Sequence, residues 1–260
     1  MNSRYLVRDY PSKPDQTVSV IGGKALQLRK IDPVLVPNWV AITSDCPEDR
    51  ISATVFKAWT HMSVNSYQTY AVRSSAVGED GKNQSFAGIF ESKLNVRPTG
   101  LEHAVREVRD SVKDERVTAY VDTIMKTNSK YPRPSELPQT PAVIIMPMID
   151  ARYSGVLFTK EPVEGTDRML LEYEQGVGGV VDGTGDSMTF FLDPDNFYET
   201  SIERGTLPPC DDVLAHSHPP APVSYVWREA KRLENNYGKP LDIEWAIDKN
   251  DKPWVLQVRP

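Results

Sequence analysis

The sequence is poor in cysteine and has no long apolar run. Only Cys46 and Cys210 occur in 260 residues, which excludes a disulfide framework and a zinc site built from thiolates. A membrane-spanning helix needs about 18 or more consecutive apolar residues, and the chain contains no such run. The opening residues, MNSRYLVRDYPSKPD, lack the apolar core of a signal peptide. We therefore expect a cytoplasmic protein without a membrane partner.

Positive charge is also in short supply. Lys and Arg total 30 against 36 Asp and Glu, so the formal net charge is −6. This balance disfavours non-specific nucleic-acid binding, although a local basic cleft could still hold a phosphorylated small molecule. Apolar residues make up 39% of the chain, which suits a folded core, and the length fits one large domain or two small lobes.

Proline is abundant and clustered. Many of the 21 prolines fall in two breaker-rich stretches, residues 132–141 and 206–222. Before the first stretch, short strand-like runs mix with helical patterns, the clearest within Leu101–Met125. After it come the strand-like runs AVIIMPMI, YSGVLFT, RMLLEYE and SMTFFLD, and then a helical pattern that Ser224 could cap and Gly238 ends. Segregated strands and helices predict an α+β fold.

The chain closes with two strand-like runs, LDIEWAID and PWVLQVRP. A turn centred on Asn250 and Asp251, of two or four residues, pairs Glu244 with Gln257 and Asp242 with Arg259. Alternation then places these four polar residues on the same face of the hairpin, together with Val255. Trp254, Leu256 and the remaining apolar residues take the other face. Carboxylate and amide oxygens suit Mg²⁺, and a neighbouring arginine suits phosphate. A solvated face with a cross-strand ion pair is the simpler alternative.

Two further segments have the composition of phosphate-binding loops. Gly22, Gly23 and Lys24 follow a short apolar run and precede a helical pattern, so backbone N–H groups and a lysine could meet an anion there. The second segment is AVRSSAVGEDGKNQSFAG, in which a strand delivers Arg73 to a polar, glycine-punctuated loop suited to a mobile lid. An ordinary Gly-Gly turn and an exposed hairpin are the respective alternatives.

Six motifs follow one another in the chain: GGKALQL, LVPNWVAITSD, AVRSSAVGED…SFAGIFES, SGVLFTKEP, YEQGVGGVVDG and DIEWAID…WVLQVRP. In this order they resemble the nucleotide-binding part of the phosphoenolpyruvate synthase and pyruvate phosphate dikinase family, and that of rifampicin phosphotransferase. The resemblance extends from about Ile21 to Pro260. It implies an α+β ATP-grasp fold whose two lobes close on ATP. We expect these lobes at residues 1–135 and 136–260, with no phosphohistidine or pyruvate-barrel domain.

The resemblance also implies roles for single residues of the first lobe and its border. Lys24 and Arg73 would hold the phosphates of ATP. Gly88 and Ser92 would belong to the lid over the phosphate chain. Met146 and Met148 would form the strand beside adenine.

In the closing hairpin, the resemblance implies that Glu244 and Gln257 bind Mg²⁺ and that Arg259 holds the transferring group. Asp242 is a weaker candidate, either for the metal or as a partner of Arg259. Lys24, Arg73 and Arg259 together would be the catalytic residues.

Family enzymes pass phosphoryl to a histidine in a Thr-Ser-His-Ala type motif, which this sequence lacks. The expected function is therefore an ATP- and Mg²⁺-dependent phosphotransferase of the dikinase type that acts in trans, on a partner's histidine or on a small molecule. A weaker possibility is an acceptor imidazole in the loop at His216 and His218. A non-catalytic ATP-binding regulatory module and an ATP-grasp ligase are the alternatives.

Overall fold

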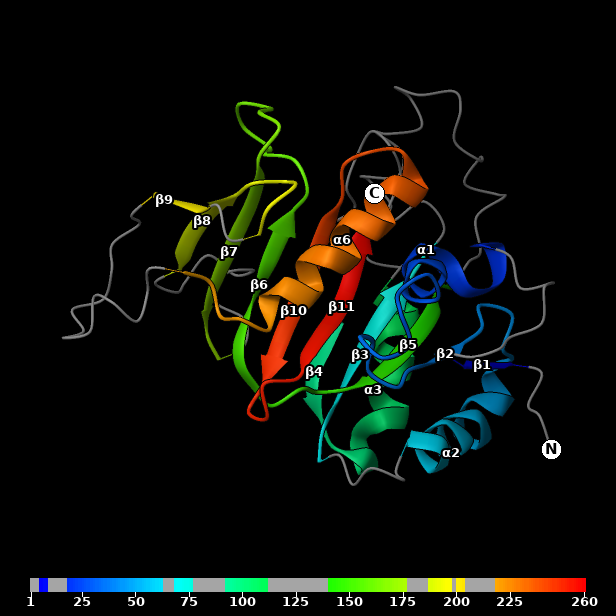
Figure 1. The fold of residues 1–260 in the computed structure, drawn as a ribbon. Coiled ribbons are helices and arrows are strands. Elements are labelled where there is room, and N and C mark those ends of the chain that lie inside the picture. Colours follow the sequence, from blue (N-terminus) through cyan, green and yellow to red (C-terminus); the bar gives the residue numbers. More distant parts are fainter. Residues whose placement is uncertain are drawn as a thin grey trace. The chain divides into compact units, whose positions relative to one another are not determined.

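The computed structural model describes residues 5–8, 18–62, 68–76, 92–111, 140–176, 187–197, 200–203 and 218–260. The chain divides into two compact units. The first comprises Met1–Arg29 and Asn38–Met148, and the second comprises Lys30–Pro37 and Ile149–Pro260. Each unit contains one antiparallel sheet and at least one α-helix (Figure 1). The α+β class predicted from the sequence is confirmed.

The first unit contains a five-stranded sheet in the order β1-β2-β5-β3-β4. Its strands are β1 (Leu6–Arg8), β2 (Val40–Ile42), β3 (Tyr70–Ser75), β4 (Ser92–Val96) and β5 (Ala142–Pro147). Its helices are α1 (Val18–Leu28), α2 (Ile51–Met62) and α3 (Leu101–Asp110), with short 3₁₀ turns at Glu48–Arg50 and Pro98–Gly100. The helix expected within Leu101–Met125 is confirmed as far as Asp110, and residues 112–139 lie outside the described part.

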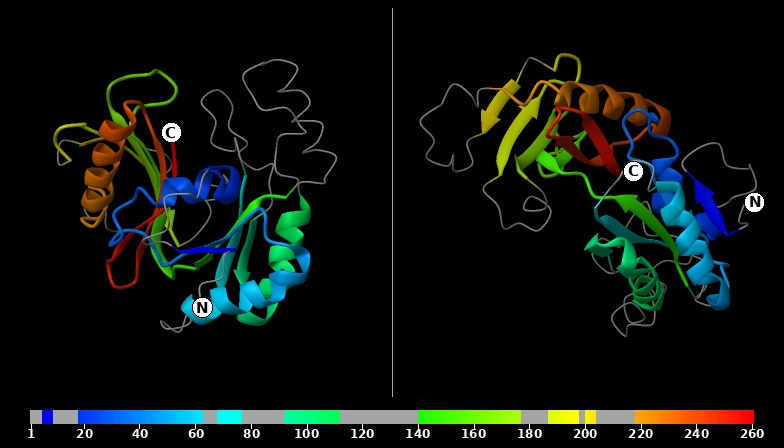
Figure 2. Two further views of the ribbon diagram at one scale, coloured as in Figure 1. Left: turned by 90° about the vertical axis from the view of Figure 1, so that its right-hand side faces the viewer. Right: turned by 90° about the horizontal axis from the view of Figure 1, so that it is seen from below.

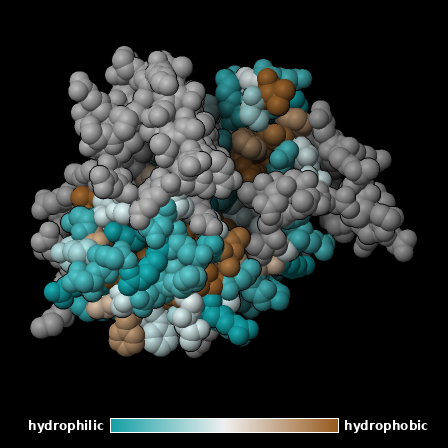
Figure 3. All heavy atoms as spheres, turned by 180° about the vertical axis from the view of Figure 1, so that it is seen from behind, coloured by the Kyte–Doolittle hydropathy of each residue, from teal (hydrophilic) through white to brown (hydrophobic). Residues whose placement is uncertain are grey.

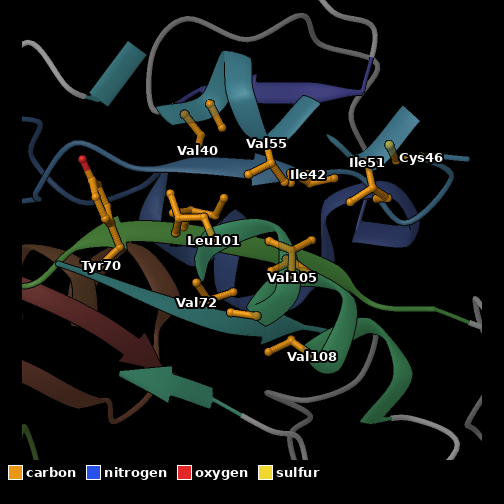
Figure 4. Packing of buried hydrophobic residues seen from close by; sticks show 14 of the residues in the cluster. Val40, Ile42, Cys46, Ile51, Val55, Tyr70, Val72, Leu101, Val105 and Val108 are labelled. Carbon is orange, nitrogen blue, oxygen red and sulfur yellow. The ribbon is translucent and has the colours of Figure 1, made fainter. Parts of the chain in front are cut away.

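An apolar core joins α2 and α3 to one face of this sheet (Figure 4). Alternate strand residues meet helix residues in one buried cluster: Val40, Ile42, Tyr70, Val72, Val143, Ile145, Ile51, Val55, Ala58, Met62, Leu101, Ala104, Val105 and Val108. Each large aliphatic side chain buried in this way contributes about 1.5–3 kcal/mol. Since neighbouring strand residues point to opposite faces, the other face carries Ala71, Arg73 and Ser75 of β3.

Helix α1 packs against β2, β3 and β5. It lies across the sheet from α2 and α3 (Figure 2). Ile21, Ala25 and Leu28 are buried there. The sheet is therefore covered on both faces, and Arg73 shares the face on which α1 lies.

The sequence predicts a lobe boundary between residues 135 and 136, but the structure places β5 in the first unit. β5 pairs with β2 on one side and with β3 on the other. All six of its residues are buried, so it requires neighbours at both edges and cover on both faces. The first unit consequently extends to Met148.

The second unit contains a six-stranded sheet in the order β11-β10-β6-β7-β8-β9. The strands are β6 (Ala151–Phe158), β7 (Met169–Gln175), β8 (Met188–Leu192), β9 (Thr200–Glu203), β10 (Asp242–Asp248) and β11 (Pro253–Arg259). Helix α6 (Val223–Tyr237) packs on β10 and β11 (Figure 1). The strand-like runs seen in the sequence after residue 141 are thus confirmed as strands.

Aromatic side chains fill the core of this sheet. The ring of Tyr173 stacks on Phe190 at 5.8 Å between centroids and lies 6.0 Å from the ring of Trp245. Gly155 lets β6 approach β7 here, because a Cβ at this position would lie 2.0 Å from the carbonyl oxygen of Glu172. The central strands can therefore pair only with glycine at position 155.

The start of α6 differs from the prediction made from the sequence. The N-cap is Pro222 and not Ser224, and no side chain caps the helix. The preceding prolines already form turns, with the Val223 N–H donating to Pro220 and the Ser224 N–H to Ala221. Since Pro222 has helix-like φ and ψ of −61° and −19°, the helix begins before the serine. Gly238 ends it in the left-handed conformation, as predicted.

Hydrophilic residues dominate the described surface seen from behind (Figure 3). The large apolar side chains that are exposed belong to both units: Val34, Phe56, Leu94, Val163 and Tyr225. Within the described residues, no helix has the length and apolarity needed to cross a bilayer.

Candidate functional site

The Gly-Gly-Lys segment adopts a tight turn against the end of β3. Gly22 has a φ of 74° and a ψ of 174°, which breaks α1 into two helical pieces. A Cβ on Gly22 would lie 1.8 Å from the carbonyl oxygen of Ser75. Only glycine fits, for both the positive φ and the close approach. The second helical piece therefore follows Gly22 and contains Lys24.

Ser75 connects this turn to the strand that carries Arg73. Its hydroxyl donates to the Ile21 carbonyl at 2.7 Å and accepts the Ala25 N–H at 3.1 Å. The Gly23 N–H donates to the carbonyl of Ala76 at 3.0 Å. The sequence predicts two separate loops at GGK and VRSSA, and in the structure these hydrogen bonds connect them. The buried serine was missed, although its place two residues after Arg73, on the same face, was a usable signal.

Arg73 and Ser92 are direct partners across β3 and β4. Arg73 is half-buried and Ser92 is exposed, so both expected phosphate-side residues lie on the α1 face of one sheet. Gly88, the other expected lid residue, lies outside the described residues. The first unit therefore brings Lys24, Arg73 and Ser92 to the same side of its sheet.

The expected adenine-side methionines differ in their surroundings. Met146 lies in β5 opposite Ala71 of β3 and is buried. Met148 follows the end of the strand, is half-buried, and its N–H donates to the Thr69 carbonyl at 3.0 Å. Pairing with β3 puts Met146 on the same sheet face as Arg73.

In the second unit, the closing hairpin has the functional pairs that the sequence predicted. Glu244 is opposite Gln257, and Asp242 is opposite Arg259. The turn differs from expectation: its loop is residues 249–251, closed by the Asp248 N–H donating to the Lys252 carbonyl, with Asp251 at a φ of 58°. A bulge next to the functional pairs offsets the one-residue difference in loop length.

The bulge changes which side chains of β11 face the core. The register shifts between Glu244 and Trp245, so Trp245 pairs with Val255. Val255 is buried, while Leu256 and Trp254 are only half-buried. The expectation that Val255 lies on the polar face and Leu256 on the core face was therefore wrong, because strict alternation does not hold across a bulge.

The polar side chains of the hairpin interact directly. The Arg259 Nη2 donates to the Glu244 Oε1 at 2.6 Å, with 25% and 13% of the two side chains exposed. Burial raises the pKa of Asp242; the charge of Arg259 opposes this effect and that of Glu244 adds to it. Gln257 is 4% exposed. Two carboxylates, an amide and a guanidinium thus share one face, and the arginine bonds to Glu244.

The described residues contain no group of three or more His, Cys, Asp or Glu side chains able to hold a metal by themselves. In proteins, Mg²⁺ commonly takes one or two carboxylates and completes its shell with water and phosphate oxygens. The donors present, a carboxylate and an amide on paired strand positions, are hard oxygen ligands of this kind.

Glu161, in the SGVLFTKEP motif, was not singled out from the sequence. Its carboxylate accepts the N–H groups of Val163, Glu164 and Gly165 and so closes the loop between β6 and β7. Burial acts to raise the pKa of Glu161, but these bonds and one from Thr166 outweigh it and lower the pKa below its ordinary value. Glu161 of this motif therefore has a structural role in the loop.

The protein has an α+β fold with two groups of candidate residues. In the first unit, the turn that contains Lys24 is hydrogen-bonded to β3, the strand that carries Arg73. In the second unit, the hairpin of β10 and β11 carries two carboxylates, an amide and an arginine. A family model described as the pyruvate phosphate dikinase AMP/ATP-binding domain matches residues 47–260, and the chain belongs to this family. The family expected from the motifs is confirmed. The matched range includes Arg73, Glu244, Gln257 and Arg259 but begins after Lys24.

Curated relatives are larger than this chain. It is 32% identical over 208 residues to the prodigiosin synthesizing transferase PigC of Serratia marcescens, and 31% identical over 213 residues to a probable phosphoenolpyruvate synthase of Methanothermobacter thermautotrophicus. Each alignment covers 73% of this chain, but only 22% and 29% of the respective relatives. Among solved structures, D-alanine-D-alanine ligase from Helicobacter pylori aligns with 87% of this chain and 49% of its own, at 13% identity and a TM-score of 0.43.

Proposed function

We propose that this chain binds ATP with Mg²⁺ and transfers a phosphoryl group to an acceptor in trans, as a phosphotransferase of the dikinase type. The main observation behind the proposal is that residues with the chemistry for phosphate and for Mg²⁺ occur together on defined faces of their units. Membership of the AMP/ATP-binding domain family supports the nucleotide. The proposed acceptor is a partner's histidine or a small molecule.

In the first unit, Lys24 and Arg73 would bind the phosphate chain. The Ser75 hydroxyl and the Gly23 N–H hold the lysine turn against β3, so little conformational entropy remains to be lost when an anion binds. Backbone N–H groups at the start of the helical piece add positive potential. Ser92, opposite Arg73, would contribute from the lid side, and Met146 and Met148 would lie beside adenine.

In the second unit, Glu244 and Gln257 would hold Mg²⁺, with Asp242 as a third oxygen donor. The bound ion would withdraw charge from the phosphate oxygens. Arg259 would leave its bond with Glu244 and contact the transferring phosphoryl group, where a planar guanidinium can donate two hydrogen bonds. These residues would act by positioning and by stabilising charge, which is the main catalytic contribution in phosphoryl transfer.

Each step of the transfer forms one bond and breaks one. The acceptor nucleophile bonds to the β-phosphorus while the bond between this phosphorus and the oxygen that bridges to the α-phosphorus breaks, so AMP departs with the electron pair on that oxygen and the acceptor carries a pyrophosphoryl group. Water then bonds to the γ-phosphorus while its bond to the β,γ-bridging oxygen breaks, which releases inorganic phosphate and leaves the acceptor phosphorylated. Lys24, Arg73 and Arg259 would stabilise the negative charge on the oxygens of the transferring group.

Phosphorus NMR of the purified protein with ATP and Mg²⁺, with and without lysate of the source organism, tests the proposal. We expect AMP with phosphate, or AMP with a phosphorylated acceptor. Glu244→Ala and Arg73→Ala should each reduce ATP turnover by about 100-fold or more, while the exposed-site controls Glu164→Gln and Arg50→Ala retain it.

Turnover that survives both substitutions would contradict the assigned residues. ADP as the product would point to a simple kinase or to a ligase. ATP that binds but stays intact under all conditions would replace the proposal with a non-catalytic ATP-binding module.

A further inference from the structure

Residues 30–37, here called the strap, follow α1 and precede β2. Both of these elements belong to the first unit, yet the strap belongs to the second. The chain therefore leaves the first unit after Arg29, returns at Asn38, and leaves again after Met148. The strap starts a few residues beyond Lys24, at the end of the same helix.

A buried glutamate of α6 holds the beginning of the strap. Glu229 is 5% exposed, and its Oε1 accepts the Asp32 N–H at 2.8 Å. Arg232 donates to both carboxylate oxygens of Glu229, from Nε at 2.7 Å and from Nη2 at 2.6 Å, and Nη2 also donates to the Lys30 carbonyl at 2.7 Å. Glu229 and Arg232 thus bind the strap through its backbone, whatever side chains the strap carries.

The end of the strap is bonded to the edge of β11. The Leu35 carbonyl accepts the N–H of Val255 at 2.6 Å. Val255 adjoins the bulge of β11, two residues before Gln257. The strap therefore contacts the hairpin at the irregularity that sets the pairing of Gln257 with Glu244.

Apolar and aromatic contacts add to these bonds. Ile31 and Val36 are buried, and the Lys30 ammonium lies 4.2 Å from the centre of the Tyr237 ring. A cation held over an aromatic ring in this way contributes about 0.5–1 kcal/mol at an exposed site. The strap is consequently fixed to α6 and β11 along its length.

We infer that the strap supports the edge of the metal-binding hairpin, and that Glu229 and Arg232 are positioning residues for the Mg²⁺ ligands of the second unit. This inference rests on the proposed function. The strap is hydrogen-bonded to Val255, two residues before Gln257, so the bonds of Glu229 and Arg232 to the strap backbone keep this edge of the hairpin in place for Mg²⁺. A loosened strap leaves the ligand side chains present but weakens the binding of Mg²⁺ to them.

The test measures how much Mg²⁺ strengthens ATP binding, as the ratio of the dissociation constants without and with the ion. It compares the wild type with Glu229→Ala and Arg232→Met, using Arg228→Met as the matched control. Arg228 is an exposed arginine on the same helix, with its guanidinium near the Tyr225 ring. Coupling between sites typically amounts to about 5- to 150-fold. We therefore expect the ratio to fall about 5-fold or more in Glu229→Ala, less in Arg232→Met, and to stay within about 2-fold of the wild type in Arg228→Met.

Hydrogen exchange provides the second readout, one that needs no ligand. In Glu229→Ala the amide of Val255 should lose protection, whereas that of Ile243, inside β10, should keep it. A variant that loses stability but keeps both the wild-type Mg²⁺ ratio and the Val255 protection would overturn the inference, and Arg232→Met tests it again if Glu229→Ala does not fold. Wild-type protein that binds no ATP would overturn the proposed function instead.

Discussion

In the first unit, the loop at the candidate site is held by close backbone contact: Gly22 lies against the Ser75 carbonyl, and one buried hydroxyl makes two bonds to the turn. In the second unit, loops are held by carboxylates that accept backbone N–H groups. Asp248 does this in the hairpin loop, Glu161 after β6, and Glu229 at the strap. The first kind of loop depends on shape and the second on charge, so the two units should differ in what disrupts them.

Gly22→Ala should have the largest effect. The added methyl group would meet the Ser75 carbonyl oxygen at 1.8 Å and occupy a backbone conformation with a φ of 74°, so we expect a loss of about 3–5 kcal/mol in the free energy of unfolding. Gly238→Ala is the control, because its φ is also positive but no atom lies within 4 Å; it should cost about 1–2 kcal/mol. Urea denaturation measures both. Equal losses would show that backbone strain, and not the close contact, explains the glycine.

Ser75→Ala should come next. It leaves the Ile21 carbonyl and the Ala25 N–H without their partner in a buried position, and each such loss costs about 1–3 kcal/mol. We expect a total of about 2–3 kcal/mol and weaker ATP binding, measured by denaturation and calorimetry. Ser111→Ala, which removes a single partly buried bond to Val108, should cost about 1 kcal/mol or less. Unchanged ATP affinity in a folded Ser75→Ala variant would show that the hydrogen bonds of Ser75 do not support ATP binding.

Asp248→Ala tests a charge-held loop of the second unit. One carboxylate oxygen accepts the N–H groups of Asn250 and Lys252, and the other accepts the Trp254 Nε1–H. Loss of these partly exposed bonds should cost about 1–2 kcal/mol. The pairing of Glu244 with Gln257 should persist, because β6 also holds β10 in register. A large loss of Mg²⁺ affinity would contradict this separation between the loop and the metal ligands.

Glu161→Gln should have the smallest effect at neutral pH and a distinctive dependence on pH. The folded-state pKa of Glu161 lies below its ordinary value, chiefly because four backbone N–H groups overcome the effect of burial. The charged carboxylate therefore stabilises the fold above the unfolded pKa of about 4.3, and this contribution is lost as pH falls through the folded pKa. Wild type should exceed the variant in stability at pH 7, and the difference should shrink in acid. Glu164→Gln, at an exposed position of the same loop, is the control. If its stability difference from the wild type changed with pH to the same extent, the backbone hydrogen bonds of Glu161 would not explain the pH dependence.

The hairpin shows how far the sequence could predict the candidate site. Alternation and a turn near Asn250 were sufficient to pair Glu244 with Gln257 and Asp242 with Arg259, since register between short antiparallel strands is set by their turn. The loop of residues 249–251 and the bulge at Leu256 could not be predicted in the same way. The loop shifts the register by one residue and the bulge shifts it back, so the functional pairs are the same with both features as with neither. The exposure of Val255 and Leu256 was wrongly predicted for this reason.

The unit boundary shows a different limit. Proline clustering indicated the break near residue 135, and local composition cannot reveal that β5 is enclosed between β2 and β3. Strand pairing joins residues remote in sequence, and its stability depends on what covers both faces. The membership of the strap in the second unit is likewise invisible to any local pattern.

By itself, the sequence determined the α+β class, the family, and the residue types available for phosphate and metal, because these follow from local periodicity and ordered motifs. Only the tertiary structure decided that Ser75 joins the lysine turn to β3 and that Arg259 bonds to Glu244. It also decided that Glu229 and Val255 hold the strap. Each of these contacts joins segments that are separate in the chain, and their energies depend on distances and burial that a one-dimensional pattern does not contain.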